Sequence, residues 1–256
     1  MSDPMLKLEG VRKAFGGVVA TNDVTLEFPE RSLSAIIGPN GAGKTTLFNL
    51  ITGHLVPDHG RILLAGEDIA GLKPAAIVNK GIGRAFQIAS IFPSLTVEEA
   101  LISAISAHMG QSGRMFQAFP PPAARQRADD MIELLQMGPV AGRKCSNISH
   151  GDQKLLDVGL ALALEPKVLL LDEPTAGMGP EERWEMINTV RRLWETQDMT
   201  LIFIEHDMGI VFEVAQTINV LKYGAVLASG PPDAIRGNPD VIEAYLGTEM
   251  DEEGAA

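Results

Sequence analysis

Residues 38–46 read Gly38-Pro39-Asn40-Gly41-Ala42-Gly43-Lys44-Thr45-Thr46 and contain the strongest indication of the fold. The run before it, Leu33-Ser34-Ala35-Ile36-Ile37, is apolar and ends in β-branched residues, as a buried strand does. In the run after it, residues 45–52, leucine and isoleucine recur at helical spacing. This strand, loop and helix predict a phosphate-binding loop.

The glycines of this loop allow the backbone to turn so that several N–H groups point at one oxyanion. The helix that follows adds the positive end of its dipole. Lys44 is expected to reach the β- and γ-phosphates, and the Thr45 hydroxyl to join the coordination of Mg²⁺. The alternative, a glycine-rich turn before an ordinary helix, does not require every fixed position to be filled. The sequence therefore predicts binding of a nucleoside triphosphate.

Length and composition indicate an ordinary globular protein of one or two domains, with 256 residues, 45% apolar and 21% charged. The net charge of −12 argues against a general nucleic-acid role, which favours a basic face. A single cysteine, Cys145, excludes an internal disulfide and suits a reducing compartment. His54 and His59 flank a Pro-Asp turn and are not expected to hold a metal.

No apolar run approaches the roughly 18 residues needed to cross a bilayer, and the first residues do not read as a signal peptide. We therefore expect a soluble, cytosolic protein that reaches a membrane only through a partner. Residues 251–256 read as a solvated acidic tail.

Strand and helix patterns alternate along the chain and predict an α/β protein with a mainly parallel sheet. Strands are expected near residues 6–11, 24–28, 33–37, 61–64, 82–86, 167–171, 201–204, 217–221 and 225–228. Helices are expected at 45–52, 152–163 and 180–195, and short ones close the chain. In the helix at 180–195, one face is read as core rather than as a cofactor-binding face, and it comprises Trp184, Ile187, Val190, Arg191 and Trp194. Residues 96–137 are rich in Ala, Leu, Ile and Met at helical spacing around a loop at 110–122, and look like a helical insertion.

A second motif, Val168-Leu169-Leu170-Leu171-Asp172-Glu173, supplies what the phosphate loop lacks. Its apolar strand runs through a covered sheet, and Asp172 emerges at the carboxyl end, where it can hold Mg²⁺ directly or through water. Glu173 can polarise the attacking water as general base. A strand that happens to end in two acids is the alternative, but the pairing with a complete phosphate loop favours hydrolysis of the nucleotide.

Between these motifs lies Ile148-Ser149-His150-Gly151-Asp152-Gln153-Lys154. Ser149 is expected to cap a helix from Asp152 to Ala163, and Gly151 to let the backbone approach a ligand closely. An ordinary helix cap is the alternative. If Ser149 and Gly151 do more than cap the helix, they form a second anion-binding site, in addition to the phosphate loop at 38–46.

The order of phosphate loop, Gln87, serine-glycine signature, Leu-Leu-Leu-Asp-Glu and Glu205-His206-Asp207 resembles the ATP-binding subunits of ABC transporters over nearly the whole chain. The resemblance implies a P-loop NTPase (RecA-like) α/β core with an antiparallel β subdomain and an inserted α-helical subdomain. Residues 1–250 would form the ATP-binding domain, with the core at 1–87 and 155–250 and the helical insertion, which includes the signature, at 88–154.

The resemblance also implies roles for residues that are ambiguous by themselves. Phe15, whose type and position by themselves favour a core residue, matches the aromatic that stacks on adenine. His206, which could be a surface histidine, matches the switch histidine at the γ-phosphate, and Gln87 matches the glutamine that senses Mg²⁺ and links to the membrane subunit. Ser149 and Gly151 would serve the facing subunit, so that two chains enclose two ATP molecules. The assignment is catalysis by Glu173, His206, Gln87 and Lys44, nucleotide binding by Phe15, residues 38–46, Ser149 and Gly151, and Mg²⁺ binding by Thr45, Gln87 and Asp172.

Two segments depart from the family. The common signature is Leu-Ser-Gly-Gly-Gln, whereas this chain has Ile148, His150 and Asp152. His150 is either a tolerated variant or a titratable group near the partner's nucleotide. Gly179 stands where many members carry aspartate, which weakens any role of that residue in communication between the two sites.

One branch of the family is particularly similar, the subunits that energise bacterial uptake of branched-chain amino acids and related small solutes. The similar segments are Phe15-Gly16-Gly17-Val18-Val19-Ala20, residues 149–153, 174–178 and 204–208, and the closing Ala244-Tyr245-Leu246-Gly247. This implies ATP and Mg²⁺ as cofactors, a homo- or heterodimer, permeases, indirectly a periplasmic binding protein, and the cytoplasmic face of the inner membrane. The alternatives are a lipopolysaccharide-exporter ATPase, a non-transport ABC ATPase, and a P-loop kinase or GTPase, although the Asn-Lys-x-Asp motif of a GTPase is missing.

Overall fold

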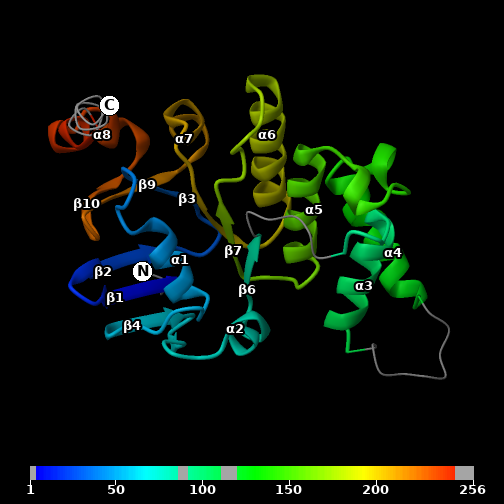
Figure 1. Ribbon diagram of the computed structural model, residues 1–256, viewed down its shortest axis with the longest axis horizontal. Helices are drawn as coiled ribbons and strands as arrows, with labels where there is room; N and C mark the ends of the chain where they lie inside the picture. Colours follow the sequence, from blue (N-terminus) through cyan, green and yellow to red (C-terminus); the bar gives the residue numbers. More distant parts are fainter. Residues whose placement is uncertain (1–3, 86–91, 111–119, 246–256) are drawn as a thin grey trace.

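The computed structural model describes residues 4–85, 92–110 and 120–245 (Figure 1). The run before the phosphate loop forms β3 (Leu33–Ile37), which is buried throughout. It is central in a six-stranded sheet of order β10-β9-β3-β8-β7-β6. The other members are β6 (Ile82–Ala85), β7 (Val168–Asp172), β8 (Thr200–Ile204), β9 (Thr217–Lys222) and β10 (Ala225–Gly230). All described pairings are parallel except that of β10 with β9, which confirms the predicted sheet.

A second sheet of order β2-β1-β4-β5 is antiparallel and confirms the predicted antiparallel subdomain. Its strands are β1 (Leu6–Phe15), β2 (Val18–Phe28), β4 (His59–Leu64) and β5 (Glu67–Asp68). β1 and β2 run further than predicted because they continue together to the hairpin at Phe15 and Val18.

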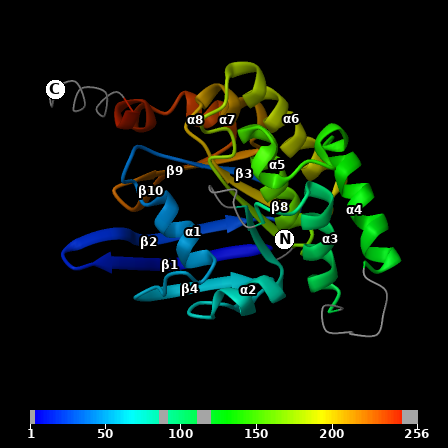
Figure 2. The same cartoon turned by 45° about the vertical axis from the view of Figure 1, so that its right-hand side comes forward.

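The helices are α1 (Lys44–Ile51), α2 (Pro74–Lys80), α3 (Val97–His108), α4 (Pro122–Leu134), α5 (His150–Leu162), α6 (Pro180–Thr196), α7 (Met208–Val214) and α8 (Pro232–Arg236). Short 3-10 turns occur at Gly138–Val140 and Cys145–Asn147, and residues 239–245 are helical. α3 and α4 lie at the opposite end of the molecule from the antiparallel sheet (Figures 1 and 2). The division of the chain at residue 154 stays a prediction; α5 runs across that position.

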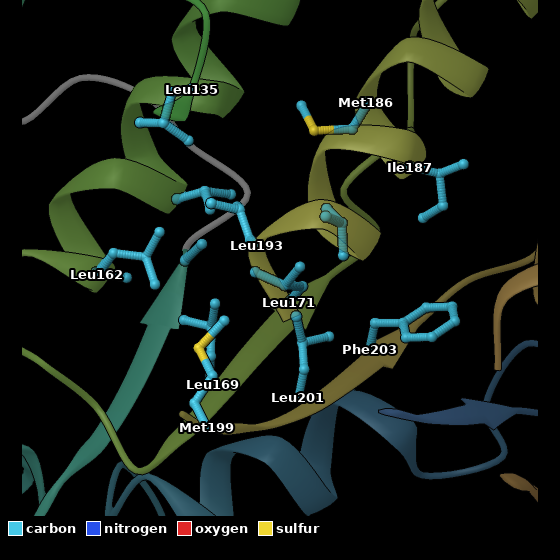
Figure 3. Packing of buried hydrophobic residues seen from close by; sticks show 14 of the residues in the cluster. Leu135, Leu162, Leu169, Leu171, Met186, Ile187, Leu193, Met199, Leu201 and Phe203 are labelled. Atoms are coloured by element: carbon cyan, nitrogen blue, oxygen red, sulfur yellow. The ribbon is translucent and has the colours of Figure 1, made fainter. Parts of the chain in front are cut away.

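Both faces of the six-stranded sheet are covered, which explains why its strands are apolar without alternation. Leu169 and Leu171 of β7 belong to one core, which also contains residues of α3, α4, α5 and α6 (Figure 3). Val168 and Leu170 face the other core, which contains α1 and the antiparallel sheet. The strand before the phosphate loop, β3, has Ala35 in the first core and Ile36 in the second, so it is packed from both sides in the same way as the strand that ends at Asp172.

Two details differ from the sequence prediction. The apolar face of α6 was expected to include Trp184 and Arg191, but both are exposed, and the buried face is formed by Met186, Ile187, Val190 and Leu193. The short helices α2 and α7 were not predicted, because each has only seven residues and too few turns to show a period. Among the described residues, no helix combines the length and apolarity needed to cross a bilayer.

Candidate functional site

The loop at residues 38–46 connects the end of β3 to the beginning of α1, as predicted. Gly38, Gly41 and Gly43 have φ values of 152°, 76° and 98°. A Cβ at Gly38 would lie 2.2 Å from the carbonyl oxygen of Leu221, and one at Gly43 would lie 2.3 Å from that of Ala20. At Gly38 and Gly43, glycine is therefore required both by the backbone conformation and by the lack of space for a side chain. The same close contacts place the loop between β9 and β2.

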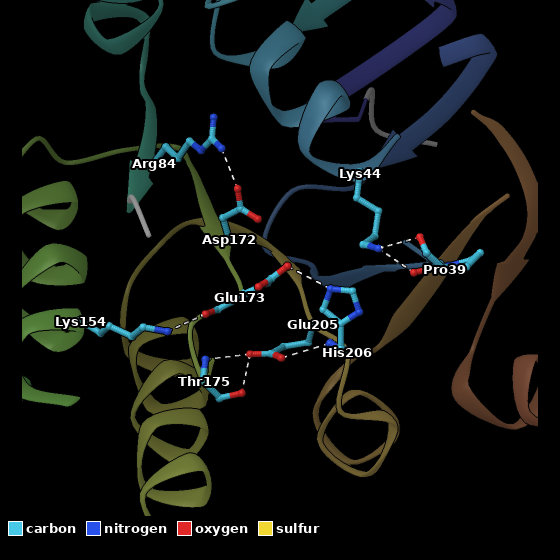
Figure 4. Close-up of polar contacts among 10 residues, drawn as sticks. Pro39, Lys44, Arg84, Lys154, Asp172, Glu173, Thr175, Glu205 and His206 are labelled. Carbon is cyan, nitrogen blue, oxygen red and sulfur yellow. Dashed lines mark hydrogen bonds and ion pairs between the residues drawn. The ribbon is translucent and has the colours of Figure 1, made fainter. Parts of the chain in front are cut away.

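Lys44 is the first residue of α1 and only 6% exposed. Its Nζ donates to the carbonyl oxygens of Gly38, at 2.6 Å, and Pro39, at 3.1 Å (Figure 4). Burial lowers the pKa of this lysine, against the opposing effect of the charges on Glu173 and Asp172. The ammonium group is thus placed across the mouth of the loop, where phosphate oxygens would be better partners than neutral carbonyls.

Asp172 ends β7 and is buried, as predicted for a strand that delivers a carboxylate to the edge of the sheet. Its Oδ2 lies 2.7 Å from Nη2 of Arg84, and both side chains are more than nine-tenths buried. Nη1 of the same arginine donates to Oδ1 of Asn49 on α1, at 2.7 Å. The arginine therefore ties the carboxylate to the helix that follows the phosphate loop.

Glu173 and His206 follow the ends of the neighbouring strands β7 and β8 and meet in the structure. Nε2 of His206 lies 3.0 Å from Oε1 of Glu173. Glu173 has a φ of 50°, unusual for a residue with a side chain, and its backbone N–H donates to the carbonyl oxygen of Ile204, at 3.0 Å. The chain turns sharply at this glutamate while it remains attached to β8, which directs the carboxylate at the imidazole.

Ser149 caps α5 as predicted: its Oγ accepts from the backbone N–H of Asp152, at 3.1 Å. The Ser149 hydroxyl in turn lies 2.7 Å from Oδ2 of Asp152. Ser149 and Gly151 line a cleft shared with Met178 and α6. In the described parts of the chain, no hydrogen bond or ion pair joins Ser149 or Gly151 to residues 38–46, so the chain presents two separate phosphate-binding candidates.

Phe15 lies at the end of β1 and is 47% exposed, so it is not a core residue. Nζ of Lys13 lies 5.7 Å from the centre of its ring. The exposed ring is available to stack on a base. Thr45 is exposed at the beginning of α1. Gln87 and the acidic tail at 251–256 lie outside the described residues.

Sequence reasoning gave no individual role to the residues that hold Asp172, Glu173 and His206 in place: Arg84, Lys154, Thr175 and Glu205. Lys154 is 6% exposed within the apolar α5, and Glu205 is 3% exposed after the apolar β8. A charged residue inside an apolar helix, or directly after a buried strand, was the available signal, because such residues are rarely buried without partners.

The residues fit a nucleotide with Mg²⁺. In the described ranges, no group of three or more His, Cys, Asp or Glu could hold a metal by itself. Mg²⁺ does not require one, since it is commonly bound by one or two protein oxygens together with phosphate and water. The Thr45 hydroxyl and the Asp172 carboxylate are hard oxygen donors of this kind, next to a loop built for phosphate.

Fold and site together define an ATP-binding cassette, a P-loop ATPase built on a mainly parallel sheet. Residues 21–176 match the ABC transporter family, and residues 225–251 match the family described as branched-chain amino acid ATP-binding cassette transporter. The chain belongs to the ABC transporter family, which confirms the resemblance found in the sequence.

The relatives cover almost the full length. The chain is 39% identical over 254 residues to the high-affinity branched-chain amino acid transport ATP-binding protein LivG of Salmonella typhimurium, covering 96% of this chain and 99% of that protein. It is 38% identical, with the same coverage, to LivG of Escherichia coli. Among solved structures, the ADP conformation of MJ1267, an ATP-binding cassette of an ABC transporter, is 31% identical with a TM-score of 0.83, covering 95% of this chain and 98% of that one.

Proposed function

We propose that this chain is the ATP-hydrolysing subunit of an ABC importer for branched-chain amino acids or related small solutes. The observation that carries the catalytic part is the contact between Glu173 and His206 beside a complete phosphate loop. The near full-length similarity to branched-chain amino acid transport ATP-binding proteins supports the solute class.

In this proposal the amides of residues 38–46 and Lys44 hold the β- and γ-phosphates, and Phe15 stacks on adenine. Thr45 and Asp172, together with Gln87, would hold Mg²⁺, which supplies neutralisation of the phosphate charge when bound. Glu173 accepts a proton from the attacking water while the water oxygen forms a bond to the γ-phosphorus. The bond between the γ-phosphorus and the oxygen that bridges it to the β-phosphate breaks, and ADP leaves. His206 orients Glu173 and contacts the γ-phosphate.

The second phosphate-binding candidate suggests a dimer. Ser149 and Gly151 would complete the site of a facing ATP-binding subunit, either a second copy or a different chain. Closure on ATP and opening after hydrolysis would then drive permease subunits at the cytoplasmic face of the inner membrane, with a periplasmic binding protein delivering the solute. The helical region near 88–140 would transmit the motion.

Mixing two inactive variants tests action in trans. Ser149→Arg chains and Lys44→Ala chains should each hydrolyse little ATP alone, and their mixture should regain one good composite site per dimer. An absence of rescue in a mixture shown by affinity co-purification to contain mixed dimers would contradict the dimer.

A reconstituted complex tests the solute class. In proteoliposomes that contain the chain with its permeases, leucine-loaded binding protein should stimulate hydrolysis several-fold. Stimulation by lipopolysaccharide, with no response to leucine, would favour the exporter instead.

A further inference from the structure

The carboxylate of Glu205 connects two parts of the site that are distant in sequence (Figure 4). Its Oε1 accepts from the backbone N–H of Thr175, at 2.8 Å, and from the Thr175 hydroxyl, at 2.7 Å. Its Oε2 accepts from the backbone N–H of His206, at 3.2 Å. One buried carboxylate thus bridges the loop that follows Glu173 and the backbone of His206.

The same loop is held from the other side by Lys154 of α5. Nζ of Lys154 donates to the carbonyl oxygens of Glu173, at 2.9 Å, and Ala176, at 2.7 Å. The charge of Glu205 raises the pKa of this lysine, against the larger lowering by burial, so the two charges act on one another across the loop. A buried carboxylate with three donors and a nearby ammonium group is compensated, whereas one without them would be costly.

These contacts form a closed circuit around the catalytic pair. The His206 imidazole meets the Glu173 carboxylate at 3.0 Å. From His206 the circuit continues through its backbone N–H to Glu205, from there to Thr175, and back along two residues of chain to Glu173. The distance between imidazole and carboxylate therefore depends on the length and charge of the Glu205 side chain.

We propose that Glu205 is a positioning residue for ATP hydrolysis, which sets the contact between His206 and Glu173 by fixing the two backbones that carry them. The proposal rests on the catalytic roles given above to Glu173 and His206. In this proposal Glu205 contacts neither the nucleotide nor the attacking water, and it acts only through Thr175 and His206.

Glu205→Gln isolates the effect, because it keeps the size of the side chain. A carboxylate accepts on both oxygens, whereas an amide has one accepting oxygen and an NH₂ group. The amide must therefore direct its NH₂ group either at Thr175 N–H or at His206 N–H, and one arm of the bridge is lost. We expect kcat at saturating ATP to fall about 10- to 100-fold, as for small misplacements of catalytic groups, with the Kd for a fluorescent ATP analogue within about twofold of wild type.

A double-mutant cycle separates positioning from general damage. If Glu205 acts through His206, Glu205→Gln should cost less than about threefold in kcat when added to His206→Ala. Equal fold-losses in the two backgrounds would overturn the proposal. If His206→Ala and Glu173→Gln themselves leave hydrolysis unchanged, the catalytic roles proposed for His206 and Glu173 are wrong. That result is distinguishable from a failure of the role proposed for Glu205.

Two Thr175 variants keep the test decisive if Glu205→Gln does not fold. Thr175→Val removes the hydroxyl that donates to Glu205, and Thr175→Ser retains it. We expect kcat to fall about 3- to 10-fold in the first and to stay within about twofold in the second. Equal activity of the two would contradict the proposal.

Asp157→Asn is the matched control, since it makes the same carboxylate-to-amide change at a residue of α5 that is 7% exposed and, in the described structure, has no side-chain hydrogen bond to residues 173–176 or to Glu205. Its kcat should remain within about twofold of wild type. A loss equal to that of Glu205→Gln would mean that removal of any buried charge suffices, and would overturn the proposal.

Discussion

The imidazole of His206 and the carboxylate of Glu173 lie within hydrogen-bond distance, with 3.0 Å between Nε2 and Oε1, although 33 positions separate them in the chain. They meet because β7 and β8 are parallel neighbours in register, with Asp172 opposite Ile204. Carboxyl ends of parallel strands share one edge of a sheet, so side chains that follow neighbouring strands converge there.

Glu173→Gln should separate binding from hydrolysis. The amide oxygen can still accept from His206, but it cannot take the proton of the attacking water. We expect the ATP affinity to stay within about threefold and kcat to fall by at least about 100-fold, as when a general base is removed. With ATP, a dimer should accumulate, which light scattering after gel filtration would detect. Wild-type turnover would contradict the assigned base.

The pair of Arg84 and Asp172 should behave as a coupled unit in stability. Arg84→Met leaves a buried carboxylate without this cation and should lower the Tm by about 6–12 °C, the range expected for loss of one partner of a buried pair. Asp172→Asn should also lower it. The double variant should lose clearly less than the sum of the two, measured without nucleotide. Additive losses would show that the pair is not coupled.

The sequence was sufficient for the fold, and it located the loop and the carboxylates that we propose bind and hydrolyse the nucleotide. The loop at 38–46 and the apolar run ending at Asp172 each show a recognisable residue pattern, a clear end of a strand, and residue types that phosphate or Mg²⁺ binding requires. These features were enough to locate both in the fold. The residues that position them could not. Arg84 and Glu205 gain their partners only through sheet order and the turn at Glu173, which are tertiary features that no local pattern encodes.

The same limit explains the errors on single residues. Trp184 was expected on the buried face of α6 because a large apolar residue favours burial, but the turn of the helix places it outward and 43% exposed. For Phe15, the sequence left open whether the side chain is buried or exposed. Its strand continues to a hairpin tip that the sequence pattern did not reveal, and that position leaves the ring exposed.

Phe15 should contribute to affinity and not to turnover. Phe15→Ala removes an exposed ring and should raise the Kd for ATP about 3- to 10-fold, consistent with the loss of one aromatic contact, with kcat changed less than twofold. Phe15→Trp should retain affinity. Val56→Ala, at another exposed apolar side chain, serves as the control. Unchanged affinity in Phe15→Ala, measured by fluorescence titration, would remove Phe15 from the nucleotide site.

Asp157 should make stability depend on pH. It is 7% exposed on α5, its Oδ2 has no hydrogen-bond partner in the described structure, and burial raises its pKa to about 7, partly opposed by the charge of Lys154. Between about pH 4 and pH 7 the folded protein therefore binds more protons at this group than the unfolded chain does. The contribution of Asp157 to the free energy of unfolding thus decreases as the pH rises through that window, and stays low above it.

Asp157→Asn removes this titration without a change of shape. Its Tm should exceed that of wild type by about 3–6 °C at pH 8, and the difference should shrink towards zero near pH 4.5. Asp129→Asn, at an exposed carboxylate of α4, controls for the loss of one surface charge. Calorimetry of the three proteins across this range decides the matter. A difference between Asp157→Asn and wild type that is constant with pH would show that the carboxyl keeps one charge state throughout, and that its burial is compensated by neighbours such as Lys154.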